Sequence, residues 1–240
     1  MKTGRGGQLR SAAVVTAAVF FAGCAATPSR VDPFEPFNRA MFSVHEVVDG
    51  NVVKPVAEGY VKFVPELLRT GVANFFGNID DLFIGINNML EGNGYRAGDD
   101  FGRVLLNTTF GLGGIFDLAS MMGIEKHNQD FGITFGKWGI EQGPYLFVPL
   151  FGPTTVRDGT GTVIRYFLGP VTYIVNDVPV RNIIYGVGYT NLRAQALETE
   201  KVIDTAAIDK YRFIRNAYLR ARRAQVYDGK PPPEEDEEGQ

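Results

Sequence analysis

The chain has little of what catalytic and disulfide-stabilised proteins depend on. Its 240 residues include one cysteine, two histidines and four serines. A single cysteine excludes a disulfide within the chain, so packing must hold the fold. No histidine, cysteine and carboxylate group has the spacing of a zinc site, and no serine lies in the Gly-x-Ser-x-Gly sequence of a hydrolase nucleophile. The phosphate-binding sequence Gly-x-x-x-x-Gly-Lys-Ser/Thr is also missing, which argues against ATP hydrolysis. We therefore expect neither an enzyme nor a bound metal or cofactor.

Long apolar runs and excess positive charge are lacking too. Beyond Phe21 no uninterrupted apolar run is long enough to span a bilayer. The chain has 24 basic and 27 acidic residues, a net charge of −3, and five of the acids lie in residues 234–238. A body this close to neutral argues against nucleic-acid binding, which needs a basic face. Residues 229–240, with three prolines before the acids, are predicted to be a disordered tail.

The N-terminal residues resemble an export signal that ends at the one cysteine. Lys2, Arg5 and Arg10 precede an apolar run over residues 12–21, and two small residues then lead to Cys24. This order is typical of a secretory signal over residues 1–23. A cysteine directly after it resembles a bacterial lipobox, which implies cleavage before Cys24 and acylation there. The alternative is an ordinary signal followed by an incidental cysteine. Residues 24–33 would form a lipidated tether with a reach of at most about 30 Å.

Apolar residues at spacings of three and four predict that most of the chain is helical. A helix is expected over residues 34–48, and residues 49–51 (Asp-Gly-Asn) should stop it. The longest pattern, residues 65–90, has apolar residues on one side and asparagines and aspartates on the other. Because burying those polar groups is costly, we expect that side to follow a surface or a wet passage. Asp80 and Asp81 are expected on a solvated face. Further helices are predicted over residues 99–109, 115–122, 154–167, 180–203 and 208–227.

Residues 131–161 are rich in glycine and proline and follow neither a helical nor a strand period. We predict an apolar hairpin with short helical turns. Two interpretations stay open, a mobile gate or partner-facing loop and a rigid plug. The final helix also has two interpretations. Its arginines form either a solvated face or a phosphate-binding one, since guanidinium groups match phosphate oxygens. His45, on an apolar helix, is expected to be structural rather than a catalytic base.

Several sequence blocks, in order along the chain, resemble one family. The first blocks are Asp32-Pro33-Phe34-Glu35-Pro36-Phe37-Asn38-Arg39, Lys54-Pro55-Val56-Ala57 and Asn74-Phe75-Phe76-Gly77-Asn78. Later blocks are Arg103-Val104-Leu105-Leu106-Asn107-Thr108-Thr109, Gly113-Gly114-Ile115-Phe116-Asp117, Asp130-Phe131-Gly132, Trp138-Gly139, Gly143-Pro144-Tyr145, Leu150-Phe151-Gly152-Pro153 and Arg157-Asp158-Gly159. They resemble the MlaA (VacJ) outer-membrane lipoproteins over residues 32–227.

The resemblance implies a mostly α fold, a ring-like bundle of amphipathic helices over residues 34–228, embedded in the periplasmic leaflet of the outer membrane. It implies an amphipathic channel that passes phospholipids mislocalised in the outer leaflet to a soluble periplasmic carrier, and association with a porin trimer. The channel or gate candidates in this sequence are Phe42, Ser43, Val44, Gly143, Pro144 and Tyr145. The candidates for binding a lipid headgroup are Arg212, Arg215 and Arg222.

Two other classes of function compete with transport. A structural envelope lipoprotein would need the anchor but no polar passage. A lipid hydrolase would need a nucleophile and a base, for which the sequence offers few residues. Phospholipid bound to the purified protein would separate transport from scaffolding.

Overall fold

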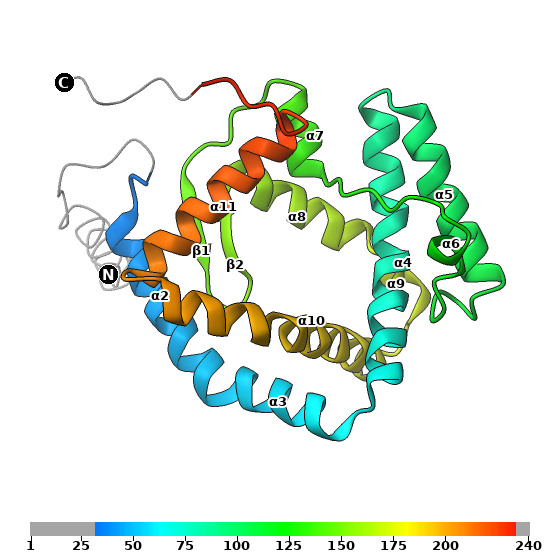
Figure 1. Ribbon diagram of the computed structural model, residues 1–240, viewed down its shortest axis with the longest axis horizontal. Coiled ribbons are helices and arrows are strands. Elements are labelled where there is room, and N and C mark those ends of the chain that lie inside the picture. Colours follow the sequence, from blue (N-terminus) through cyan, green and yellow to red (C-terminus); the bar gives the residue numbers. More distant parts are fainter. Residues whose placement is uncertain (1–31, 234–240) are drawn as a thin grey trace, which may run out of the picture.

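The structure, a computed structural model, describes residues 32–233. Helices dominate this part of the chain and follow one another around a ring, so that the first and last long helices, α2 and α11, meet on one side (Figure 1). In chain order the elements are α2 (Glu35–Val48), the π-helix η1 (Asp49–Val53), α3 (Lys54–Phe63), α4 (Glu66–Leu90), α5 (Gly94–Thr109), α6 (Leu118–Met121), α7 (Phe131–Lys137), β1 (Tyr145–Val148), β2 (Gly152–Thr155), α8 (Val156–Leu168), α9 (Pro170–Ile174), α10 (Val178–Ala206) and α11 (Lys210–Val226).

Most of the predicted helices are confirmed, and local signals explain where several begin. The side chains of Asp130, Thr155, Asp177 and Asp209 each accept a hydrogen bond from a backbone N–H in the first turn of α7, α8, α10 and α11. These caps satisfy N–H groups that have no partner within the helix. None of the described helices is both long and apolar enough to cross a membrane. Cys24 and residues 234–238 lie outside the described residues, so acylation and the disordered tail stay predictions.

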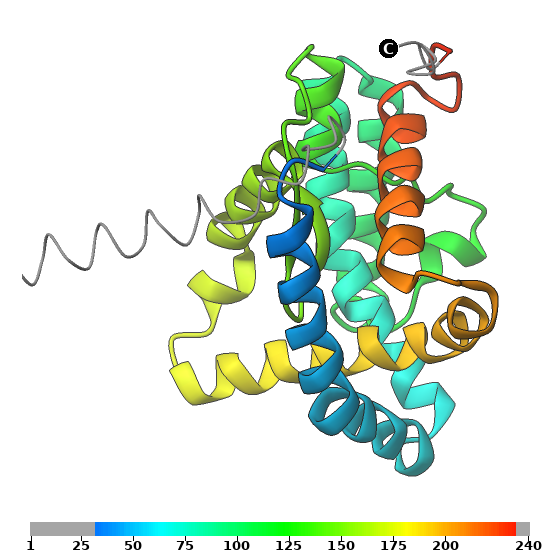
Figure 2. The same cartoon turned by 90° about the vertical axis from the view of Figure 1, so that its left-hand side faces the viewer.

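The stop expected at residues 49–51 is wrong, because the chain continues helically from α2 through η1 into α3. The backbone N–H of Lys54 bonds to the carbonyl of Asp49, five residues back, as in a π-helix. Asp49 is buried, and its carboxylate forms an ion pair with Arg193 of α10. The wider turn therefore keeps the backbone hydrogen-bonded through Gly50. Figure 2 shows α10 crossing behind α2 at this junction.

Helix α4 buries polar residues that the sequence predicts to be exposed. The asparagines and aspartate Asn78, Asp81, Asn87 and Asn88 are buried together with Phe83 and Ile84, and α4 packs closely along α5. Near the start of the helix, by contrast, Leu67 is 75% and Leu68 60% exposed. The expected surface or wet passage along the asparagines is therefore wrong. Hydrogen bonds to specific partners offset the cost of burying these amides. Asn88 donates to Asp100 of α5 at 2.6 Å, and Asn78 donates to Thr108 at 2.9 Å.

Arg103 of α5 is the centre of this polar interface. Its side chain is fully buried and forms ion pairs with Asp81 at 3.0 Å and Asp117 at 2.9 Å. It also donates to the carbonyl of Ile124 at 2.8 Å. The expected solvated face is therefore wrong for Asp81. The adjacent Asp80 points elsewhere and pairs with Arg165 of α8, as adjacent residues of a helix should diverge.

The same inversion extends over the described residues. Buried polar and charged side chains outnumber buried apolar ones, and many large apolar side chains are exposed. A soluble globular domain has the reverse arrangement. An exposed apolar surface this extensive indicates contact with a membrane or with other proteins.

The hairpin predicted within residues 131–161 is confirmed and is fastened to α2. Strands β1 and β2 are antiparallel, with Tyr145 opposite Thr155. The side chain of Asn38 donates to the Tyr145 carbonyl and accepts from the Phe147 N–H, both at 3.0 Å. Tyr145 and Phe147 are buried with Tyr211 of α11 in the apolar cluster of this side. The strands are therefore part of the packed body.

Replacing Arg103 with methionine should strongly destabilise the fold. The variant leaves Asp117 without an ion-pair partner and Asp81 with only the partly exposed Lys126. Because a buried charge loses its partner, the free energy of unfolding should fall by about 3–5 kcal/mol. Arg96→Met, at an exposed position of the same helix, should change it by less than about 0.5 kcal/mol. Urea unfolding in detergent, followed by circular dichroism, measures both. Equal stability of the two variants would contradict a central role for Arg103.

Candidate functional site

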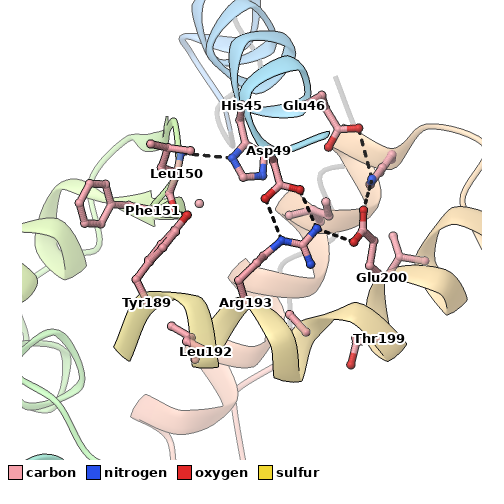
Figure 3. Close-up of a pocket in the computed structure, with 15 residues that line it drawn as sticks. His45, Glu46, Asp49, Leu150, Phe151, Tyr189, Leu192, Arg193, Thr199 and Glu200 are labelled. Atoms are coloured by element: carbon pink, nitrogen blue, oxygen red, sulfur yellow. Dashed lines mark hydrogen bonds and ion pairs between the residues drawn. The ribbon is translucent and has the colours of Figure 1, made fainter. Parts of the chain in front are cut away.

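A cavity of about 290 Å³ lies where α2 and η1 meet α10, the start of α11 and the tip of the hairpin (Figure 3). It draws on four separate parts of the ring, so it depends on the whole fold. The residues that line it are His45, Glu46, Asp49, Leu150, Phe151, Gly152, Tyr189, Leu192, Arg193, Ala196, Thr199, Glu200, Ile203, Lys210 and Ile214.

One wall of the cavity is a row of ion pairs. The Nε and terminal nitrogens of Arg193 bind the two oxygens of Asp49 at 2.8 and 2.6 Å, and the guanidinium also reaches Glu200 at 2.5 Å. Lys210 continues the row with Glu46 at 3.2 Å. The hydrogen bonds from Arg193 hold the pKa of Asp49 below its usual range, although burial opposes them. Charges of both signs thus alternate along this wall.

The facing wall is apolar. Leu150 and Phe151, at the tip of the hairpin, lie across the cavity from Glu200 (Figure 3). Phe151 is 81% exposed and Leu192 of α10 is also exposed. The cavity is therefore amphipathic, with one side suited to a charged group and the other to hydrocarbon.

Two side chains hold the tip of the hairpin in place. The Leu150 N–H donates to Nδ1 of His45 at 3.2 Å, and the Tyr189 hydroxyl donates to the Leu150 carbonyl at 2.8 Å. Leu150 has φ of 69°, a left-handed conformation that costs a leucine about 1–2 kcal/mol. Burial lowers the pKa of His45, which keeps the imidazole neutral and able to accept. The prediction of a structural His45 is confirmed, because Nδ1 is already engaged.

The channel candidates on α2 lie beside this cavity without lining it. Phe42 packs edge-on against Phe147 at 5.2 Å between ring centroids. The Ser43 hydroxyl donates to the Arg39 carbonyl at 3.0 Å, and Val44 is exposed. Phe42 and Val44 therefore present their apolar surfaces to the core and to the outside, respectively. Their role in a channel stays a prediction.

The candidates before β1 also lie outside the cavity. Gly143 has φ of 66°, which suits a glycine at the turn into β1. Pro144 is partly exposed, and Tyr145 is almost fully buried against Tyr211. This arrangement anchors the base of the hairpin, and the tip is the part that lines the cavity. A gating role for these three residues stays a prediction.

The arginines of α11 have intramolecular partners. Arg215 pairs with Asp32 at 3.2 Å and Glu35 at 3.1 Å. Arg222 pairs with Asp130 at 2.6 Å and Asp158 at 2.9 Å. Both are buried, so the interpretation of a solvated face is wrong for them. The side chain of Arg212 is 60% exposed, which leaves it the most accessible of the three. Binding of a headgroup by these arginines stays a prediction.

Sequence reasoning missed the residues that form the charged wall. Asp49 and Arg193 are 144 positions apart, and neither lies in a recognisable motif. Asp49 was interpreted as a helix stop because Gly50 and Asn51 follow it. Only the closure of the ring brings the two side chains together.

A family model described as MlaA lipoprotein matches residues 30–225. The chain belongs to the MlaA lipoprotein family. The resemblance noted in the sequence is thereby confirmed.

Two relatives and one solved structure extend the match. The Escherichia coli K12 protein named intermembrane phospholipid transport system lipoprotein MlaA is 30% identical over 241 residues, covering 97% of this chain and 95% of that one. The Haemophilus influenzae protein of the same name is 34% identical over 223 residues, which cover 89% of this chain and 88% of that one. A solved structure from a study entitled "Structural basis for maintenance of bacterial outer membrane lipid asymmetry" superposes with a TM-score of 0.71 at 30% identity, covering 82% of this chain and all of that one. The mostly helical MlaA fold is therefore confirmed for this chain.

The Asp49–Arg193 pair should make stability depend on pH. A carboxylate with a lowered pKa in the folded state contributes stability above its unfolded pKa, and loses it as pH falls through the folded value. Wild-type stability should therefore decline below about pH 4. Asp49→Asn should be less stable at neutral pH and decline less steeply. Thermal unfolding from pH 7 to pH 3 measures this, with Glu66→Gln at an exposed position as control. Parallel profiles for Asp49→Asn and wild type would contradict it.

Proposed function

We propose that this MlaA-family lipoprotein passes phospholipid from the outer leaflet of the outer membrane through its ring to a soluble periplasmic carrier, and so maintains lipid asymmetry. The observation that supports it best is the amphipathic cavity of Figure 3, enclosed by a fold whose apolar side chains face outward. The names of the two relatives, which describe phospholipid transport, point the same way.

The two walls fit the two parts of a phospholipid. A charged headgroup that leaves water for hydrocarbon pays a large desolvation cost unless polar groups replace its hydration. The row formed by Arg193, Glu200 and Lys210 offers both signs of charge for that purpose. Leu150 and Phe151 offer apolar contact to the acyl chains. Because the cations already pair with carboxylates, they would hold a phosphate weakly, which suits passage rather than storage.

The proposal extends to location and partners. Acylation at Cys24 would anchor the chain, and the exposed apolar residues would embed the ring in the periplasmic leaflet of the outer membrane. A porin trimer and a soluble carrier are the proposed protein partners. Transfer would be passive, with energy supplied elsewhere in the envelope.

The alternatives have less support. For a hydrolase, His45 would have to release Leu150 before acting as a base, and the nearby Ser43 hydroxyl donates to a backbone carbonyl. A pure scaffold would need no charged cavity wall.

Filling the cavity should block transfer. Ala196→Trp places a large ring among the lining residues, whereas Gln195→Trp, one position earlier on α10, points about 100° away. Reconstituted wild-type protein should move labelled phospholipid to a soluble acceptor without nucleotide. Ala196→Trp should reduce the rate roughly tenfold, a barrier of about 1.4 kcal/mol, and Gln195→Trp should not. Release of lysolipid or fatty acid matching the lipid lost would support the hydrolase instead. Equal rates for the two variants would remove the cavity from the path.

Locking the tip of the hairpin should also slow transfer, because Leu150 and Phe151 form one wall of the cavity. Cysteines replacing His45 and Leu150 place two thiols where the His45 side chain contacts the backbone of Leu150. A crosslink between the two cysteines, formed with a short cleavable bifunctional thiol reagent, should lower the transfer rate. Cleavage of the crosslink should restore the rate. The two single-cysteine variants, treated alike, are the controls. Full activity of the locked form would favour a rigid plug over a gate.

A further inference from the structure

A second hollow lies around the corner between α3 and α4, away from the cavity of Figure 3. Its larger part has a volume of about 830 Å³ and includes Val64, Leu68, Val72 and Phe75 in its walls. A smaller part, about 490 Å³, lies between α3 and α10. Tyr60, Ile183 and Val187 line both parts, and we call the two adjacent parts together the apolar trough. It shares no lining residue with the cavity of Figure 3.

The floor of the trough is open because two glycines line it. Gly59 of α3 and Gly186 of α10 both line the smaller part. A Cβ atom added at either position would meet nothing within 4 Å. Larger residues would therefore fit at these positions without a clash and would occupy space in the smaller part of the trough.

Arg69, beside the larger part of the trough, has no ion-pair partner among the described residues. The Nε of Arg69 donates to the Val64 carbonyl at 3.1 Å, and this is its one hydrogen bond within the described residues. Val64, whose carbonyl Arg69 contacts, lines the larger part of the trough, so the guanidinium lies next to that part. Glu66, three residues before Arg69 on α4, is the nearest acidic residue in sequence, and it forms no ion pair with Arg69 or with another cation of the described residues. Arg103, Arg193, Arg215 and Arg222, by contrast, all pair with carboxylates.

A second cation lies on the other side of the same corner. The ammonium of Lys62 lies 5.4 Å from the ring centroid of Phe63, which lines the smaller part of the trough. Lys62 likewise has no carboxylate within ion-pair distance in the part of the chain that the structure describes. Two cations that form no ion pair within the described residues, beside an apolar depression, are complementary to an anionic group that carries hydrocarbon.

We propose that the apolar trough is a binding site for one phospholipid, with its phosphate at Arg69 and its acyl chains along Tyr60, Ile183 and Val187. An arginine fork matches the oxygens of a phosphate, and free terminal nitrogens make that contact available. The ligand class rests on the proposed function, but the site is separate from the proposed passage. Because its arginine has no competing carboxylate, this site retains a lipid, whereas the ion-paired wall of the other cavity releases one.

Retention of lipid by the purified protein tests the site. The protein is reconstituted with vesicles of phosphatidylethanolamine and phosphatidylglycerol, returned to a phospholipid-free detergent and analysed by native mass spectrometry. Wild type should retain one phospholipid. Arg69→Gln should lower the retained fraction roughly tenfold, as expected for loss of a charge-assisted hydrogen bond. Gly59→Leu and Gly186→Leu should lower it similarly by filling the floor. Arg96→Gln and Gly98→Leu on α5, where an added Cβ also meets nothing within 4 Å, are the matched controls.

Three outcomes would overturn the site: no phospholipid retained by wild type, equal retention by Arg69→Gln and Arg96→Gln, or retention unaffected by either glycine variant. A photo-crosslinking residue at Leu68 that captures a protein in membranes, with no lipid adduct, would also overturn it in favour of a protein partner.

The transfer assay with Ala196→Trp separates this proposal from the proposed function. Predicted retention without any transfer would sustain the site and contradict the function, and transfer without retention would do the reverse.

Discussion

Buried ion pairs hold the ring together, and the rest of the structure depends on them. Arg103 joins α5 to α4, Arg193 joins α10 to the junction of α2 and α3, and Arg222 joins α11 to α8 and the start of α7. In a water-soluble domain such pairs contribute little net stability, because the charges lose their hydration. Here they occupy interior positions and leave many large apolar side chains exposed, which suits contact with a membrane or with other proteins.

The same interactions set the chemical character of the two hollows. Arg193 stabilises the fold and also lines the cavity of Figure 3, so its charge is already balanced by Asp49 and Glu200. Arg69, beside the apolar trough, has no such partner within residues 32–233. Coulomb attraction in a partly buried site is strong, and an existing carboxylate competes with an incoming phosphate. In our two proposals, whether a site would release or retain a lipid therefore depends on whether its arginine is already neutralised.

Periodicity located most of the helices, and turn residues located the hairpin, because both depend on neighbours in sequence. The stop predicted at Asp49 failed for a non-local reason, since an ion pair with a residue 144 positions away stabilises a continuous helix there. The charged wall of the cavity was missed for the same reason. The family resemblance supplied the class of function, while Arg193, Tyr189 and Glu200 became candidates only when the ring brought them together.

The sequence by itself determined that the chain is mostly helical, has a single cysteine after a predicted export signal and belongs with the MlaA lipoproteins. Spacing along α4 also separated a polar from an apolar side, because both sides repeat with the helical turn. It did not determine which side faces inward, since the same pattern serves a soluble and a membrane-embedded helix. Only the tertiary structure decided that, because burying Asp81 and Asn88 is favourable only when Arg103 and Asp100 of α5 lie opposite them.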